Sequence, residues 1–279
     1  MKNTPYFCYR EATNMTELEP LLRLRYQVFK EEESTKALFP DNELGMEIDY
    51  FDLKSRHFGI YLVMNGQSIP VGYQRIIHET ETSIASNLRL WASRYPSLLR
   101  KITPVNTPLY LMTVNNSKAM WDYYLDKKAN GATFEEASRT SFLSAYRSYE
   151  LTKFIFYANM AIGFFDDGCN TGITSCTSKL SVIHSRLGLR KIEHCDYTFE
   201  NMAFCVMEIT KADFQFQQCS YLENMAEAFQ ATGSICLHQE QPHYYYPPAW
   251  FAFAGLSSRT FLPAMLRAAH VHRPMAMAS

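Results

Sequence analysis

The sequence predicts a mixed α and β fold, in which one sheet of mixed strand direction is covered by helices. Amphipathic helical patterns alternate with strand-like apolar runs from about residue 15 to residue 210. Strand-like runs occur in adjacent pairs at both ends of this region, which is typical of meanders. With 279 residues, 47% of them hydrophobic, the chain is long enough to bury a sizeable core.

The first half of the region predicts a helix, a loop and a hairpin. A helix is expected from about Met15 to Glu32, because Asn14 and Glu17 form a capping pattern before an apolar stripe. Arg25 lies inside this stripe, so it should face inward; the alternative is a position at the edge, with the charge reaching water. After a loop over 31–46, strands are expected at 57–64 and 69–77, on either side of an Asn-Gly turn.

Residues 78–132 are the least legible part, with short helical stretches, a short strand over 109–114 and a possible share in a substrate pocket. A strand over 134–143 carries charge at its middle, which suggests a bulge opening onto a site. The remaining elements follow as a helix over 147–165, a strand over 172–176, a helix over 178–188, strands over 189–194 and 203–210, and a helix around 221–230. A Tyr- and Pro-rich run follows at 244–248. We therefore divide the chain into a domain of residues 1–210 and a C-terminal, partly helical extension of residues 211–279.

Composition excludes several classes of protein. The net charge of −1 argues against a nucleic-acid partner. The first ten residues lack the apolar region of a secretory signal, and no apolar run has the length of a transmembrane segment. Seven cysteines occur without CxxC or zinc-like spacing, which favours free thiols in a reducing compartment. We expect a cytoplasmic protein without a metal site.

Three carboxylates occur within the six residues from Glu47 to Asp52, among Ile, Tyr and Phe. Carboxylates on one face of a chain repel one another unless cations lie beside them. Each candidate cation lies in an apolar or patterned stretch, where a buried arginine needs a carboxylate partner. These arginines are Arg25, Arg75 and Arg139.

Together these residues resemble the signature of the autoinducer synthase superfamily, which includes acyl-homoserine-lactone synthases, N-acyl amino acid synthases and exosortase-associated acyltransferases. Four motifs occur in the order of that signature: Arg25 with Phe29, Glu47-x-Asp49-x-x-Asp52, Gly72-x-x-Arg75 and Glu136-x-Ser138-Arg139. The resemblance covers residues 25–139 and implies a GNAT-like fold through residue 210. Residues 211–279 lie outside it.

The resemblance implies an N-acyltransferase that moves a long-chain fatty acyl group from an acyl carrier protein thioester to the amine of an amino acid or a similar small amine, with no other cofactor. Residues 30–39 lack the tryptophan usual in lactone synthases, and the gap between Arg75 and Glu136 is longer than theirs. Both differences favour an amine other than S-adenosylmethionine. The alternatives are a lactone synthase that uses S-adenosylmethionine, and an inactive binding or regulatory module.

Such chemistry needs a base and donors for an oxyanion. Glu47 or Glu136 is the candidate base, and backbone amides freed at a bulge near Ser138 are candidates to bind the thioester carbonyl or the pantetheine arm. We predict that the cluster converges on one cleft; the alternative is an inert buried ion network. The expected binding or structural residues are Arg25, Phe29, Asp49, Asp52, Arg75, Ser138 and Arg139.

Overall fold

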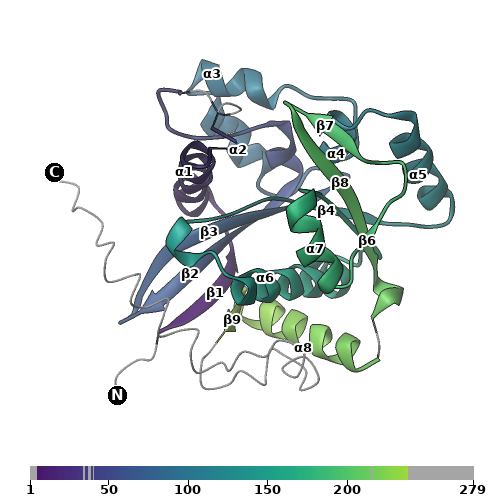
Figure 1. Ribbon diagram of the computed structural model, residues 1–279. Helices are drawn as coiled ribbons and strands as arrows, with labels where there is room; N and C mark the ends of the chain where they lie inside the picture. The colour runs from purple at the N-terminus through teal and green to yellow at the C-terminus, as the bar shows by residue number, and fades with distance from the viewer. Residues whose placement is uncertain (1–4, 34, 37–38, 40, 215, 238–279) are drawn as a thin grey trace, which may run out of the picture.

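The computed structural model describes residues 5–33, 35–36, 39, 41–214 and 216–237 (Figure 1). Its strands are β1 (Tyr6–Glu11), β2 (Ser55–Met64), β3 (Gln67–His78), β4 (Phe134–Phe142), β5 (Thr171–Thr177), β6 (Arg190–Lys191), β7 (Tyr197–Phe199), β8 (Met202–Thr210) and β9 (Ser234–Leu237). Its α-helices are α1 (Met15–Glu31), α2 (Ala85–Ala92), α3 (Pro96–Leu99), α4 (Tyr110–Val114), α5 (Lys118–Ala129), α6 (Tyr149–Ala161), α7 (Ser178–Arg186) and α8 (Phe216–Thr232). Two short helical segments also matter for the site, the 3-10 helix η2 (Tyr50–Lys54) and the π-helical turn η5 (Ile162–Asp166).

The strands form one sheet in the order β6-β8-β5-β4-β3-β2-β1-β9, with β7 paired to β8. Neighbouring strands are antiparallel except β4 and β5, which are parallel. That parallel pairing runs only from Phe134 opposite Thr171 to Glu136 opposite Ile173, and beyond it the two strands no longer pair with each other. The predicted fold class is confirmed in that the sheet is mixed and largely antiparallel, and helices flank it.

Helices cover both faces of the sheet (Figure 1). Because successive strand residues point to opposite faces, Phe7 and Tyr9 of β1 pack in the core with α6 and α8, whereas Cys8 packs in the core with α1 and α2. The first core also contains apolar residues of β2 and β3. The sheet therefore separates the core that contains α6 from the core that contains α1, and we call the two sides of the sheet the α6 face and the α1 face.

The predicted helix and hairpin near the N-terminus are confirmed. The Asn14 side chain accepts a hydrogen bond from the Glu17 amide at the start of α1, and the α1 stripe buries Arg25 completely. Asn65 and Gly66 have φ values of 52° and 77° between β2 and β3, as a tight hairpin turn requires.

Several element predictions were wrong or incomplete. The segment predicted as a strand over 109–114 is helix α4, because a short apolar run does not distinguish a strand from one buried helical turn. Within the strand predicted over 189–194, only Arg190–Lys191 pairs. Strands β1, β7 and β9 were not predicted, since each is short and its pairing partner lies elsewhere in the chain.

The described part of the C-terminal region packs on the sheet. Helix α8 contributes Leu222 and Phe229 to the core of the α6 face, and β9 pairs antiparallel with β1. The boundary after residue 210 stays a prediction, and the Tyr- and Pro-rich run at 244–248 lies outside the described residues. No helix within the described residues combines the length and apolarity needed to cross a bilayer.

Candidate active site

The carboxylate of Asp52 holds two buried arginines. Asp52, Arg25 and Arg75 are each 0% exposed. Arg25 donates from Nη1 and Nη2 to the two Asp52 carboxylate oxygens, at 2.9 Å each, and Arg75 donates from Nη1 to Oδ1 at 2.8 Å. Burial opposes ionisation, but the positive fields of Arg25 and Arg75 outweigh it and hold the pKa of Asp52 well below its usual range. Asp52 is thus a permanent anion at the centre of the cluster.

Asp49 and Asp52 shape the backbone as well as the ion pairs. Asp49 caps η2 by accepting a hydrogen bond from the Phe51 amide at 2.9 Å, and Asp52 Oδ2 accepts from the Asp49 amide at 2.8 Å. Asp49 also accepts from Arg75 at 2.7 and 2.9 Å. This reciprocal capping explains the Asp-x-x-Asp spacing, because it sets both carboxylates against the arginines.

Two residues of this network were missed from the sequence. The Tyr73 hydroxyl accepts from Arg25 Nη1 at 2.9 Å and lies 2.7 Å from His57 Nδ1, while His57 Nε2 lies 2.9 Å from the Asp52 carbonyl oxygen. Burial lowers the pKa of His57 to about 4, so the ring is neutral at pH 7. Because the carbonyl can only accept, Nε2 donates and Nδ1 accepts from Tyr73. Strand alternation was an available signal, since Tyr73 precedes Arg75 by two positions.

Glu47 lies between two arginines. One carboxylate oxygen contacts Arg25 Nε, and the other accepts from Arg139 Nη2 at 3.3 Å and Nε at 3.4 Å. The Arg139 guanidinium also lies over the rings of Tyr110 and Phe29, 4.6 and 5.9 Å from their centroids. The predicted pairing of acids with arginines is therefore present, and Tyr110, from the 78–132 segment, contributes to it.

The bulge predicted in β4 is present at Arg139. Opposite β3, Tyr73 pairs with Ser141 and Arg75 pairs with Ser138, so β4 has one extra residue between these pairs. Arg139 has a φ of 56°, a left-handed conformation that is uncommon for a residue other than glycine. The bulge turns Ser138 and Arg139 toward the same cavity.

Glu136 differs from the other carboxylates of the site. It is 1% exposed, and Oε2 accepts a hydrogen bond from the Leu111 amide at 2.9 Å. Burial raises the pKa of Glu136 from 4.5 to about 7, with the Leu111 amide and then the nearby arginines opposing the rise. No ion pair between described residues includes it. Its proton is therefore exchangeable near neutral pH.

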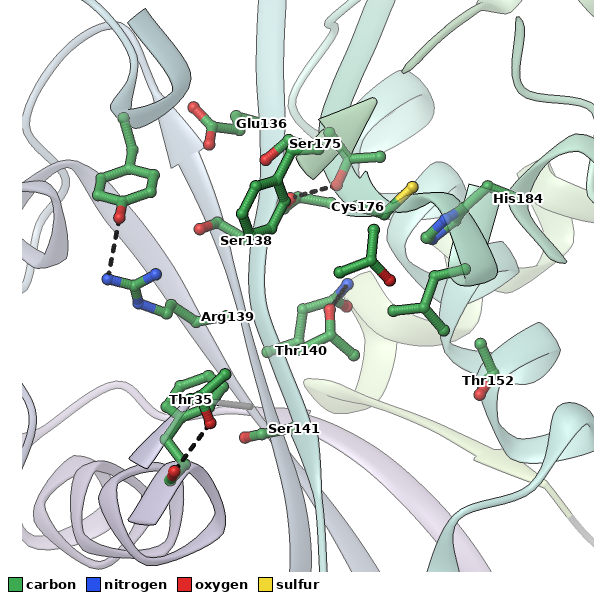
Figure 2. A pocket seen from close by; sticks show the side chains of 18 of the residues that line it. Thr35, Glu136, Ser138, Arg139, Thr140, Ser141, Thr152, Ser175, Cys176 and His184 are labelled. Carbon is green, nitrogen blue, oxygen red and sulfur yellow. Dashed lines mark hydrogen bonds between the residues drawn. The ribbon is translucent and has the colours of Figure 1, made fainter. Parts of the chain in front are cut away.

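A cavity of about 1490 Å³ extends between the ends of β4 and β5 that do not pair with each other, and onto both faces of the sheet. In Figure 2, Glu136, Ser138 and Arg139 lie on one side of the central strands, and Cys176 and His184 lie on the other. Of the predicted residues, those that line the cavity form its wall, namely Phe29, Glu47, Glu136, Ser138 and Arg139. The other four do not line the cavity, namely Arg25, Asp49, Asp52 and Arg75.

The arrangement separates two tasks. The buried arginines and aspartates hold the wall, and Glu136 with the bulged strand faces the space where a ligand fits. Residues 110 and 111 complete the wall, which is consistent with a contribution of the 78–132 segment to a pocket. Within the described ranges, no three His, Cys, Asp or Glu side chains are placed to hold a metal ion.

Among the known proteins compared with the chain, no family model and no curated protein matches. Several solved structures are similar to the chain. FeeM, an N-acyl amino acid synthase from uncultured soil microbes, is 12% identical, with 74% of this chain and 92% of FeeM covered and a TM-score of 0.43. The CoA-dependent acyl-homoserine lactone synthase BjaI is 16% identical, with 75% and 82% covered and a TM-score of 0.45. The acyl-homoserine lactone synthase LasI is 17% identical, with 74% and 89% covered and a TM-score of 0.42.

Proposed function

We propose that the protein is an N-acyltransferase, which moves a long-chain acyl group from an acyl carrier protein thioester to the amine of an amino acid or a similar small amine in the cytoplasm. The observation that carries this proposal is Glu136, a buried carboxyl with a pKa of about 7 that lines the cavity beside a bulged strand. Such a group exchanges a proton at neutral pH without solvent around it.

In the proposed reaction, Glu136 takes a proton from the ammonium group of the acceptor, directly or through one water. The freed amine nitrogen attacks the thioester carbonyl carbon and forms the new C–N bond. Backbone amides at the bulge near Ser138 donate hydrogen bonds to the oxyanion that develops. When the C–S bond breaks, the second nitrogen proton passes to the leaving thiolate, so an amide and a free thiol result.

Between the two candidate bases, the contacts favour Glu136. Glu47 has an arginine on each side, so its carboxylate already neutralises fixed charge. Glu136 accepts one backbone hydrogen bond and keeps the rest of its carboxyl toward the cavity. We therefore assign Glu136 the proton transfer and Glu47 the positioning of Arg139.

Arg139 supports an amino acid as the acceptor. Its side chain is 18% exposed, and its contacts with Glu47 are long for charged partners. A guanidinium with a free edge at a cavity wall binds a carboxylate well. An amino acid would then present its amine to Glu136 and its carboxylate to Arg139.

The proposal is tested by incubating the purified protein with acyl carrier protein loaded with a labelled fatty acyl chain and pooled amino acids. Parallel reactions replace the donor by acyl-CoA or the acceptor by S-adenosylmethionine, and a Glu136→Gln protein serves as control. A labelled acyl amino acid made only by the wild type supports the proposal. A lactone that needs S-adenosylmethionine supports the lactone synthase alternative. No product with a folded protein favours a binding module.

A further inference from the structure

The cavity also reaches three buried polar side chains on the α6 face, Gln74, Glu135 and Asn159, which we call the inner polar group. Glu135 follows the strand alternation and points to the face opposite Glu136. It packs against η5 on that face, since a Cβ at Gly163 would lie 1.8 Å from Glu135 Oε2. None of these three side chains takes part in the proposed proton transfer.

Two members of the inner polar group have atoms without partners. Glu135 is 0% exposed and Asn159 is 1% exposed, yet neither Glu135 carboxyl oxygen nor Asn159 Oδ1 has a hydrogen-bond partner among the described residues. Gln74 differs, because its amide accepts from Tyr9 at 2.8 Å and donates to Thr140 at 3.0 Å. Glu135 and Asn159 are therefore the groups available to a ligand.

The chemical state of Glu135 follows from its surroundings. Burial raises the pKa of Glu135 well above its ordinary value, and the negative field of Asp167 adds to the rise. Burial thus favours the neutral carboxyl, which has one O–H donor and one free acceptor oxygen. Asn159 lies one helical turn before Gly163, on the helix surface that packs against Glu135. Together the two side chains offer both a donor and an acceptor.

The position of the group decides which part of a ligand reaches it. Arg147 and Ser148 line the cavity at the start of α6, where the Arg147 side chain is 44% exposed. Asn159 lies about 15 Å farther along the helix axis, at 1.5 Å per residue from Tyr149. Glu135 lies where β4 is still paired with β5, opposite Gly172. An acyl group that enters beside the exposed Arg147 extends its chain toward the inner polar group.

We infer that the preferred acyl donor carries a hydroxyl group on its chain, and that Glu135 and Asn159 bind this hydroxyl. The inference rests on the proposed acyl transfer. A chain that fills the cavity displaces water from these atoms, and an unsubstituted chain leaves them unpaired. A hydroxyl is the smallest substituent that both accepts from the Glu135 O–H and donates to Asn159 Oδ1. A site built for a hydroxyl discriminates against the analogue that lacks it.

The test uses the full chain and acyl donors of one chain length, in which a hydroxyl is moved along the chain one carbon at a time. We expect kcat/KM about tenfold higher at the matching position than for the unsubstituted donor. Glu135→Gln keeps a donor and an acceptor and should keep most of this preference. Glu135→Leu should abolish the preference, so that hydroxylated and unsubstituted donors react with equal kcat/KM. Near-ultraviolet circular dichroism checks that both variants are folded.

Two results would overturn the inference. One is equal kcat/KM for every hydroxyl position and the unsubstituted chain. The other is a Glu135→Leu protein that reacts more slowly with all donors by the same factor. That result would mean that Glu135 contacts the pantetheine arm or supports the fold. If no donor is transferred at all, the proposed reaction fails instead. Calorimetric binding of non-cleavable hydroxyacyl and acyl thioether analogues then decides the inference by itself, since tighter binding of the hydroxyl form supports it and equal binding contradicts it.

Discussion

The buried carboxyl of Glu136 makes a quantitative prediction about stability. In the folded protein its pKa is raised by burial from 4.5 to about 7. Between these values the folded chain binds a proton that the unfolded chain has released, so stability falls as pH rises through this window. The difference of about 2.5 in pKa, at 1.36 kcal/mol for each unit, corresponds to about 3 kcal/mol lost by pH 8.

Glu136→Gln isolates this effect. Glutamine has nearly the same size, keeps an oxygen for the Leu111 amide and does not titrate. Urea unfolding of both proteins at about pH 4 and about pH 8 gives the difference in free energy of unfolding at each pH. We expect the wild type to lose about 3 kcal/mol relative to the variant between these values, so that the variant is the more stable protein at the higher pH.

The matched control is Glu193→Gln, which removes an exposed carboxylate outside the site. Its stability difference from the wild type should not change over the same range by more than about 0.5 kcal/mol. If the Glu136→Gln difference is equally constant, Glu136 is already ionised at low pH. The assignment of a neutral, exchangeable proton to this residue would then be wrong.

Three further predictions follow from the same contacts. Asp52→Ala leaves two buried arginines without their shared carboxylate and should lower the free energy of unfolding by about 3–5 kcal/mol. Asp49→Ala should lower it by less, because the Asp49 side chain is 22% exposed. Urea unfolding compares the two variants, and equal effects would argue against the central role of Asp52. Cys8 and Cys236 face each other across β1 and β9 with sulfur atoms 3.3 Å apart, so diamide should oxidise them to a disulfide. The disulfide should stabilise the fold by about 2–4 kcal/mol and is detected by non-reducing peptide mass spectrometry and a higher Tm. Free thiols after treatment would contradict this prediction. In the proposed reaction kcat/KM should fall about tenfold per pH unit below about pH 7, since Glu136 acts only when ionised, and a flat profile would remove it as the base.

The parts of the site that could be predicted depend on short-range patterns. The inward position of Arg25 follows from its place in a helical stripe, and the bulge follows from charge in the middle of a strand. The Asp49 and Asp52 pair could be recognised because three-residue spacing is what reciprocal capping requires. In each case, neighbours in the sequence determine the geometry.

The parts that could not be predicted depend on contacts between distant segments. The amide of Leu111 reaches Glu136 because residues 110–114 form a helical turn, and their apolar run is too short to reveal it. The pairing of β9 with β1 joins residues 228 positions apart. The sequence indicated no role for Glu135, because only the two faces of the sheet distinguish its surroundings from those of Glu136.

The proposed function is tested most directly by mass spectrometry of lipid extracts from cells that express either the wild type or Glu136→Gln at equal levels. We expect an acylated amine in the wild-type extract that is absent from the Glu136→Gln extract. The same product in both extracts would contradict the role of Glu136. No acylated amine in either extract, from cells that contain the folded protein, would contradict acyl transfer itself.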